Sequence, residues 1–463
     1  MNSQSSSRAA DVPEVALQDF NVDRRTGFVP PHMPLPRLPA EWEMWEATSD
    51  AARWQKLKAA EQLLVLDGPQ KLVEEEKALA WRKRVDKMPV LSVENIKGNR
   101  RALRRAHGVL SSIVQFYAHT IPSSEPIIIP RSLTVPLLRV SKELQHAPFI
   151  TYSDHALHNW SHKELQDEAA LPTSDNLQSQ LTFTGTPDEN ELYMTDVRLE
   201  LKGAVAIELL RLATDEIEGG NENNVRIAEY LNQTAGVIEK MKDMLMSLKK
   251  LVRPEIFYHE VRPWLVGAGD DIWGRSWTWE DHEKVEGSEV MLTKISGPTA
   301  GQSPLVPALD AYLGIKEDDR KSLFLDRVRG YMDHEHEEFL QSLRSKNQTI
   351  RSFVKKIAKE QGVGSSVLLA YNAAIQAMKS FRDEHLIIVT LYVILPSKKK
   401  TRNVIGATSS ATIENGVVQG DTSCKDVTET AKGRTGDEKK EDPAVQLMKG
   451  LKGFRDHTDQ TCL

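Results

Sequence analysis

A long amphipathic segment in the middle of the chain constrains the fold more than any other sequence feature. Between Ile227 and Val252 apolar side chains recur every three or four residues, the spacing that places them on one face of an α-helix. Pro254 ends the segment, because proline lacks the N–H group that a helix interior requires. A second helix is expected over 196–217. Strand signals are few, since Ile127–Ile129 is short and bounded by prolines. The pattern predicts an all-α protein.

The length allows one large or two medium domains, because the chain has 463 residues, of which 40% are hydrophobic and 27% charged. Proline-rich and polar stretches divide it into segments of different character. We expect an extended N-terminal arm over 1–40, a small helical domain over 41–165, a large helical domain over 190–396, a disordered insert or lid over 397–441, and a C-terminal helix over 442–463.

Charge and cysteine content narrow the possible partners and compartments. With 60 Lys and Arg against 66 Asp and Glu, the net charge is −6, so no excess of positive charge would attract a nucleic acid. The only cysteines are Cys424 and Cys462, which suits a reducing compartment. The apolar run Leu386–Leu395 is about half of what spans a bilayer. We therefore expect a cytoplasmic monomer that binds neither nucleic acid nor membrane.

Histidines offer two candidate sites. His155, His158 and His162 are spaced as neighbours on one helical face, and they could hold zinc only if a fourth ligand approached. A solvated surface helix is the favoured interpretation. His385 lies between Phe381 and Ile388 on an apolar helical stripe. It could be a hydrogen-bonded core histidine or an axial ligand of a haem, and spacing alone leaves both open.

The surroundings of His385 resemble a known family. The segment Ser380–Tyr392, with the sequence SFRDEHLIIVTLY, is similar to the proximal-histidine helix of the indoleamine 2,3-dioxygenases. Further segments resemble that family in the same order along the chain: the arm at 19–39, IPRSLTVP at 129–136, PTAGQS at 298–303 and LDAYLGI at 309–315. The ordered set covers some 400 positions and is specific, whereas no single segment would be.

The resemblance implies a two-domain helical fold with haem b in the larger C-terminal domain. It also implies an oxidoreductase that uses dioxygen and an electron donor to open the indole ring of L-tryptophan, giving N-formylkynurenine. The site residues carried over are His385 as proximal iron ligand, Arg382 and Asp310 beside the haem and its propionates, Phe257, Tyr258 and Tyr152 around the indole, Arg262 on the substrate carboxylate, and Ala300 and Gly301 in a loop over the haem edge.

The chain departs from the family pattern at several positions of the expected pocket. Asp196 stands where the family has a distal serine, and His155 stands where it commonly has cysteine or a small residue. His259 adds a titratable group beside the aromatic pair, and only Gly433–Gly436 represents the glycine-rich lid. Three alternatives therefore remain: another indole substrate, a relative that binds haem or oxygen without dioxygenase activity, and a helical scaffold in which His385 is a core residue.

Overall fold

The computed structural model describes residues 17–164, 166–167, 169–220, 223–270, 272–293, 296–315, 330–345, 349–398, 451–453 and 455–463. Helices dominate these residues, and their strands have three residues each, so the all-α prediction is confirmed. Strand β1 (Ile127–Ile129) pairs in parallel with β4 (Trp277–Trp279), and β2 (Trp160–His162) pairs antiparallel with β3 (Leu177–Ser179). The proline-bounded run at 127–129 thus forms one strand of a two-stranded sheet.

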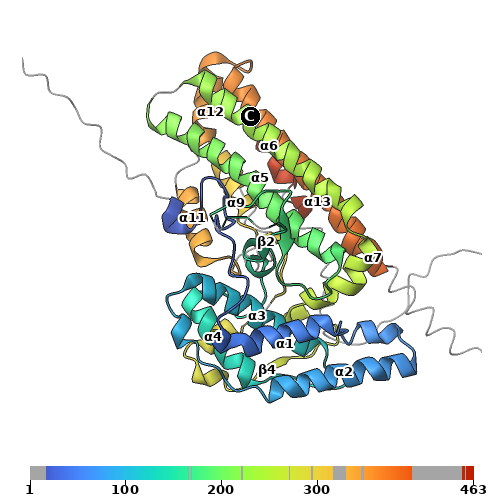
Figure 1. Ribbon diagram of the computed structural model, residues 1–463. Helices are drawn as coiled ribbons and strands as arrows, with labels where there is room; N and C mark the ends of the chain where they lie inside the picture. The colour runs from blue at the N-terminus through green and yellow to red at the C-terminus, as the bar shows by residue number, and fades with distance from the viewer. Residues whose placement is uncertain are drawn as a thin grey trace, which may run out of the picture.

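Three long helices form the centre of one half of the molecule. Helix α6 (Asn224–Leu251) packs against both α5 (Pro187–Glu218) and α13 (Ser366–Val389), as Figure 1 shows. The predicted central helix is confirmed as α6, and its N-terminus is capped by the Asn223 side chain. Helix α5 begins nine residues before the predicted start, because Thr186 caps it and Pro187 occupies the first turn, where no N–H is needed.

A large hydrophobic core surrounds these three helices. Its fully buried members include Leu231 and Met241 on α6 and Met378 on α13. Phe28 and Val29 of the N-terminal arm also belong to this core. The remaining elements of this half are η1 (Leu17–Phe20), α7 (Pro254–Ile256), η6 (Phe257–Val261), η10 (Ala300–Gln302), α9 (Leu305–Leu313), α11 (His334–Ser345), α12 (Thr349–Gln361) and η11 (Thr390–Ile394).

A second core lies in the lower half of the view in Figure 1, around α3 (Arg100–His119), which is buried along almost its whole length. Trp264 and Trp279, from much later in the chain, also pack into it. The other elements here are η2 (Ala40–Trp42), α1 (Glu43–Trp54), η3 (Gln62–Val65), α2 (Gly68–Asp86), η4 (Glu94–Ile96), α4 (Arg131–Leu144), η7 (Arg262–Leu265), η8 (Ala268–Asp270), η9 (His282–Lys284) and α8 (Ser288–Met291). The turn η5 (Ser153–Leu157) contacts both α3 and α5, and its Ala156 and Leu157 belong to the first core.

The domain boundaries expected from the sequence stay predictions. The insert at 397–441 and much of the segment 442–463 fall on residues 399–450 and 454, which lie outside the described residues. The residues described in the final segment are helical over 451–453 and 455–459. No helix in the described ranges is both long and apolar enough to cross a membrane.

Candidate active site

His385 lies near the C-terminal end of α13 with an imidazole that suits metal ligation. Burial lowers the pKa of His385 from its ordinary value; the charge of Asp196 raises it and that of Arg382 lowers it further. The ring is therefore neutral at pH 7, and no hydrogen bond joins it to another described residue. His385 nevertheless keeps part of its surface exposed. A neutral ring nitrogen that remains accessible fits a haem iron.

A buried ion pair stands one helical turn before His385. Nη2 of Arg382 donates to both carboxylate oxygens of Asp310 on α9, at 2.7 and 2.5 Å. Nη1 of Arg382 donates to Thr458, so the C-terminal segment is tied to the same group. Arg382, Asp310 and Thr458 are all buried. The contact between Arg382 and Asp310, together with the hydrogen bond to Thr458, thus joins α9, α13 and the C-terminal segment beside the candidate haem ligand.

A second polar network holds Tyr152 in place. The Tyr152 hydroxyl donates to Oε1 of Glu200 at 3.0 Å, and Ser303 donates to the same oxygen at 2.5 Å. Glu200 is 1% exposed, and burial raises its pKa to about 7, against the opposing effect of these two hydrogen bonds. The sequence reasoning missed Glu200 and Ser303 as site residues, although Ser303 closes the PTAGQS segment that carried the resemblance.

The loop that carries Ala300 and Gly301 is fixed from both sides. Gln302 accepts a hydrogen bond from the Tyr152 backbone N–H at 2.8 Å and donates to the Gly297 carbonyl at 3.1 Å. Ala300 is exposed and Gly301 is half-buried. Gly297 has no space for a side chain, because an added Cβ would lie 2.0 Å from the Leu265 carbonyl oxygen. Close backbone packing therefore sets the position of this loop.

His155 and Asp196 face one another beside this network. Nδ1 of His155 lies 3.1 Å from the Thr151 carbonyl, which can only accept, so Nδ1 carries a proton. Nε2 lies 3.5 Å from Oδ2 of Asp196. The imidazole and the carboxylate thus form a polar pair. Burial has the larger influence on the pKa of Tyr152 and of His385, but the charge of Asp196 raises both, so the pair lies near His385.

The prediction that His155, His158 and His162 share one helical face is wrong. His155 lies in the single π-helical turn η5, His158 follows that turn, and His162 lies in strand β2. Helical spacing therefore does not apply to them. Nε2 of His158 faces Asp333 at 3.5 Å, away from the pair formed by His155 and Asp196. The change from helix to strand occurs because β2 pairs with β3, a contact between distant segments that periodicity does not reveal.

Phe257, Tyr258 and Arg262 lie together in the π-helical turn η6 and at the start of η7. The Phe257 ring is 5.9 Å from that of Tyr392, which places η6 beside the end of α13. The Arg262 guanidinium lies 5.2 Å from the centre of the Tyr258 ring. No carboxylate of the described residues forms an ion pair with Arg262, so its charge is available to a ligand.

The His259 ring lies 5.1 Å from the Tyr258 ring, but its side chain is 51% exposed and faces Glu255 at 3.5 Å. The group at 257–262 and the network of Tyr152 lie on different elements, η6 with η7 and η5 with the loop at 300–303. Helix α5 contacts both η5 and η6. It is therefore the common support that the two parts share.

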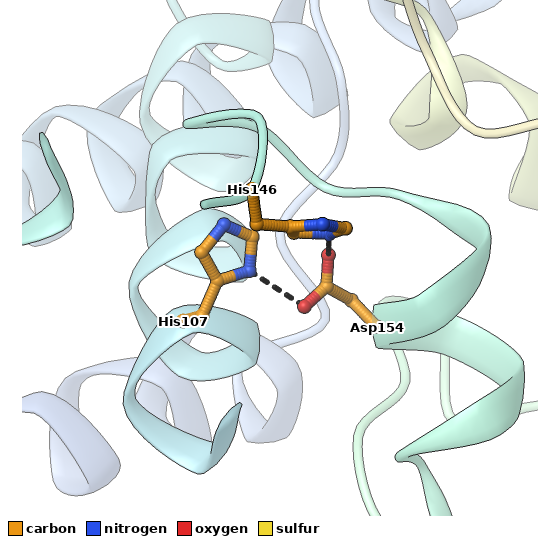
Figure 2. Close-up of side chains that lie close together, drawn as sticks. All are labelled: His107, His146 and Asp154. Carbon is orange, nitrogen blue, oxygen red and sulfur yellow. Dashed lines mark hydrogen bonds and ion pairs between the residues drawn. The ribbon is translucent and has the colours of Figure 1, made fainter. Parts of the chain in front are cut away.

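Figure 2 shows a third group, His107, His146 and Asp154, whose candidate ligand atoms lie within 4.8 Å of one another. Nδ1 of His107 is 2.6 Å from Oδ1 of Asp154, and Nε2 of His107 faces the Ala147 carbonyl at 2.8 Å. Thr151 donates to the other Asp154 oxygen from both its N–H and its hydroxyl, at 2.8 Å. These short contacts leave no gap for an ion. The group is a buried hydrogen-bonded cluster.

Buried histidines that are neutral in the folded chain predict that acid destabilises the fold. Burial, reinforced by Arg104, lowers the pKa of His146 to about 3, and burial lowers that of His336 to about 4. Both rings are neutral when folded but take up protons near pH 6.5 when unfolded. The unfolding free energy should therefore fall as the pH drops from 6.5 towards 4, by up to about 1.4 kcal/mol per pH unit for each histidine.

Urea unfolding of the full chain at pH 6.5 and 5.0 measures this effect. We expect the His146→Gln variant to lose less stability over this interval than the natural chain. The exposed His259→Gln serves as the matched control and should behave like the natural chain. Equal losses in the chain and in His146→Gln would contradict the assignment of a neutral buried His146.

An all-helical fold with a neutral, unpartnered histidine beside a buried Arg–Asp pair suits a haem-dependent oxidoreductase. The family model of indoleamine 2,3-dioxygenase matches residues 16–461. Indoleamine 2,3-dioxygenase of Saccharomyces cerevisiae is 30% identical over 407 residues, which cover 84% of this chain and 82% of that protein. Indoleamine 2,3-dioxygenase 1 of Rattus norvegicus is 29% identical over 394 residues, with coverage of 83% and 86%. A 6-hydroxytryptophan 2,3-dioxygenase of Fusarium equiseti is 27% identical over 383 residues, with coverage of 82% and 86%.

The chain therefore belongs to the indoleamine 2,3-dioxygenase family. Enzymes of this family are haem-dependent dioxygenases, so the expected enzyme class and haem cofactor are confirmed, together with a tryptophan-like substrate and dioxygen. The exact indole substrate and the role of each site residue do not follow from membership.

Proposed function

We propose that this chain opens the indole ring of L-tryptophan to N-formylkynurenine, with His385 as the proximal ligand of haem b. The observation that carries the proposal is the neutral imidazole of His385, which is partly exposed and has no hydrogen-bond partner among the described residues. When bound, the haem supplies the iron at which dioxygen becomes reactive. Arg382 and Asp310 hold α13 and α9 together beside that ligand, and Arg382 would offset propionate charge.

The protein's own contribution is to bind and orient the indole. Arg262 has no carboxylate partner within the described ranges, so its planar fork would take the substrate carboxylate. Phe257, Tyr258 and Tyr152 would hold the ring. The network of Glu200 fixes Tyr152 and, through Gln302, the loop of Ala300 and Gly301. We further propose that the enzyme works as a cytoplasmic monomer and that an electron donor keeps the iron ferrous.

A second substrate is favoured by one observation. His155 and Asp196 form a polar pair beside Tyr152, so they present a polar contact where an unsubstituted indole ring offers only carbon. A ring hydroxyl could both donate to Asp196 and accept from His155. A buried polar pair favours a ligand that forms hydrogen bonds with it and disfavours a ligand that leaves its polar atoms without a partner. The relative from Fusarium equiseti is named for 6-hydroxytryptophan, and we propose hydroxylated tryptophan as the alternative substrate.

One experiment tests both substrates. The haem-loaded chain is reduced without oxygen, then given dioxygen with L-tryptophan or 6-hydroxytryptophan, and ring-opened product is measured by absorbance. Product from L-tryptophan that requires both additions is expected. Replacement of Asp196 by serine should raise kcat/KM for L-tryptophan relative to the hydroxylated substrate by about 10-fold or more if the polar pair selects a ring hydroxyl. A normal ferrous spectrum with no product from either compound would overturn the dioxygenase proposal.

A further inference from the structure

The N-terminal arm, α3 and the start of α11 enclose a cavity of about 410 Å³ that contains none of the proposed haem or substrate residues. In Figure 1 the dark blue arm runs from beside α11 towards α3. Five arginines line the cavity against two aspartates, and Phe28, Pro30 and Leu35 of the arm form an apolar wall. This volume is within the range of small-molecule pockets.

In three of the five arginines, an ion pair with a carboxylate balances the guanidinium charge. Arg25 pairs with Asp23, Arg100 with Glu335, and Arg105 with Glu46. These pairs fix the walls of the cavity but do not by themselves call for a ligand.

Arg104 is different, because it is 4% exposed and its donors are not all used. Nη2 of Arg104 lies 2.7 Å from Oδ2 of Asp333. Nε and Nη1 meet no hydrogen-bond acceptor within the described parts of the chain. Buried guanidinium donors that remain unsatisfied are costly. Arg104 lines the cavity, so an acceptor placed there would satisfy them.

The Asp333 carboxylate faces imidazoles as well as Arg104, so it does not occupy the remaining donors of Arg104. His158 and His146 each approach it at 3.5 Å, and His336 approaches it at 4.0 Å. Nδ1 of His336 also lacks a hydrogen-bond partner within the described residues. The floor of the cavity thus combines one cationic side chain with imidazoles that can turn a donor or an acceptor towards a ligand.

We propose that this cavity binds a small organic anion, a carboxylate on a flat apolar body, at a site separate from that of the substrate. The carboxylate would accept from the free donors of Arg104 through charge-assisted hydrogen bonds. The apolar body would lie against Phe28, Pro30 and Leu35. Because Phe28 belongs to one hydrophobic core and α3 to the other, the ligand joins the two cores through the arm and stabilises their contact.

Calorimetric titration of the haem-loaded full chain with benzoate tests the site, with benzamide as the neutral probe of the same shape. Benzoate should bind with a dissociation constant of about 1 mM or tighter, and benzamide at least about 10-fold more weakly. Arg104→Lys keeps the charge beside Asp333 but loses the fork of donors, and it should weaken benzoate about 10-fold.

Further variants keep the result interpretable if Arg104→Lys folds poorly. Leu35→Asp should weaken benzoate more than Leu35→Asn does, because both variants lose the apolar contact and only the aspartate adds repulsion. Arg262→Ala should leave benzoate binding unchanged, which separates this site from the proposed substrate pocket. The proposal is overturned if benzoate does not saturate, if benzamide binds equally, if Leu35→Asp has no effect, or if Arg262→Ala abolishes binding.

Discussion

Replacing His385 with alanine is expected to remove haem from the protein. The imidazole is partly exposed, has no hydrogen-bond partner among the described residues and is neutral at pH 7, because burial lowers its pKa. Without His385 the haem iron would have no protein ligand, and only contacts with the apolar faces and the propionates would hold the haem. We expect the affinity for haem to fall by about 100-fold or more and the Soret band of the purified protein to be lost.

The control for this variant is His259→Ala, which removes an exposed histidine elsewhere on the chain. That variant should keep a full Soret band and one haem per chain. Added imidazole should restore a haem spectrum in the His385→Ala variant, because imidazole can occupy the space left by the side chain. An alanine variant that retains the native Soret spectrum without imidazole would exclude His385 as the proximal ligand.

Replacing Arg262 with alanine is expected to weaken L-tryptophan far more than an indole that lacks the carboxylate. The Arg262 guanidinium is stacked on Tyr258 and has no carboxylate partner within the described part of the chain. A charge-assisted bidentate contact contributes about 2–3 kcal/mol, so the dissociation constant of L-tryptophan should rise roughly 30- to 150-fold. Tryptamine, which has no carboxylate, should lose less than about 3-fold.

Binding of both compounds to the ferric haem protein is measured by titration of the Soret band, so the result does not depend on turnover. Arg226→Ala provides a matched control, because Arg226 is also positioned over a tyrosine, Tyr230, at 5.9 Å, but on the exposed face of α6. It should change neither affinity. Equal weakening of L-tryptophan and tryptamine in the Arg262 variant would remove Arg262 from the role of carboxylate anchor and leave it a structural one.

The elements that could be predicted from the sequence are those whose conformation depends on neighbouring residues. The period of three to four residues between Ile227 and Val252 predicts helix α6, because a helix repeats its faces at that interval whatever surrounds it. The same holds for the stripe that contains His385 on α13. Pro254 predicted the end of this helix, because the missing N–H group of proline acts on the nearest turn.

Local pattern failed where distant segments decide the conformation. The histidines at 155, 158 and 162 have helical spacing, yet a π-turn and a strand that pairs with β3 separate them. The sequence could not reveal Glu200 as a partner of Tyr152, because the two are 48 positions apart and meet only through packing of η5 on α5. The contact between His155 and Asp196 likewise depends on that packing.

The sequence by itself therefore determined the fold class, the central helices and, through ordered resemblance, the family to which the chain belongs. Tertiary structure alone decided which polar groups are neutral, paired or left with unused donors. The pKa of Glu200, the contact between Arg382 and Asp310 and the unused donors of Arg104 all follow from which distant side chains exclude water around them. Desolvation depends on three-dimensional neighbours and not on sequence spacing, so only the folded chain reveals it.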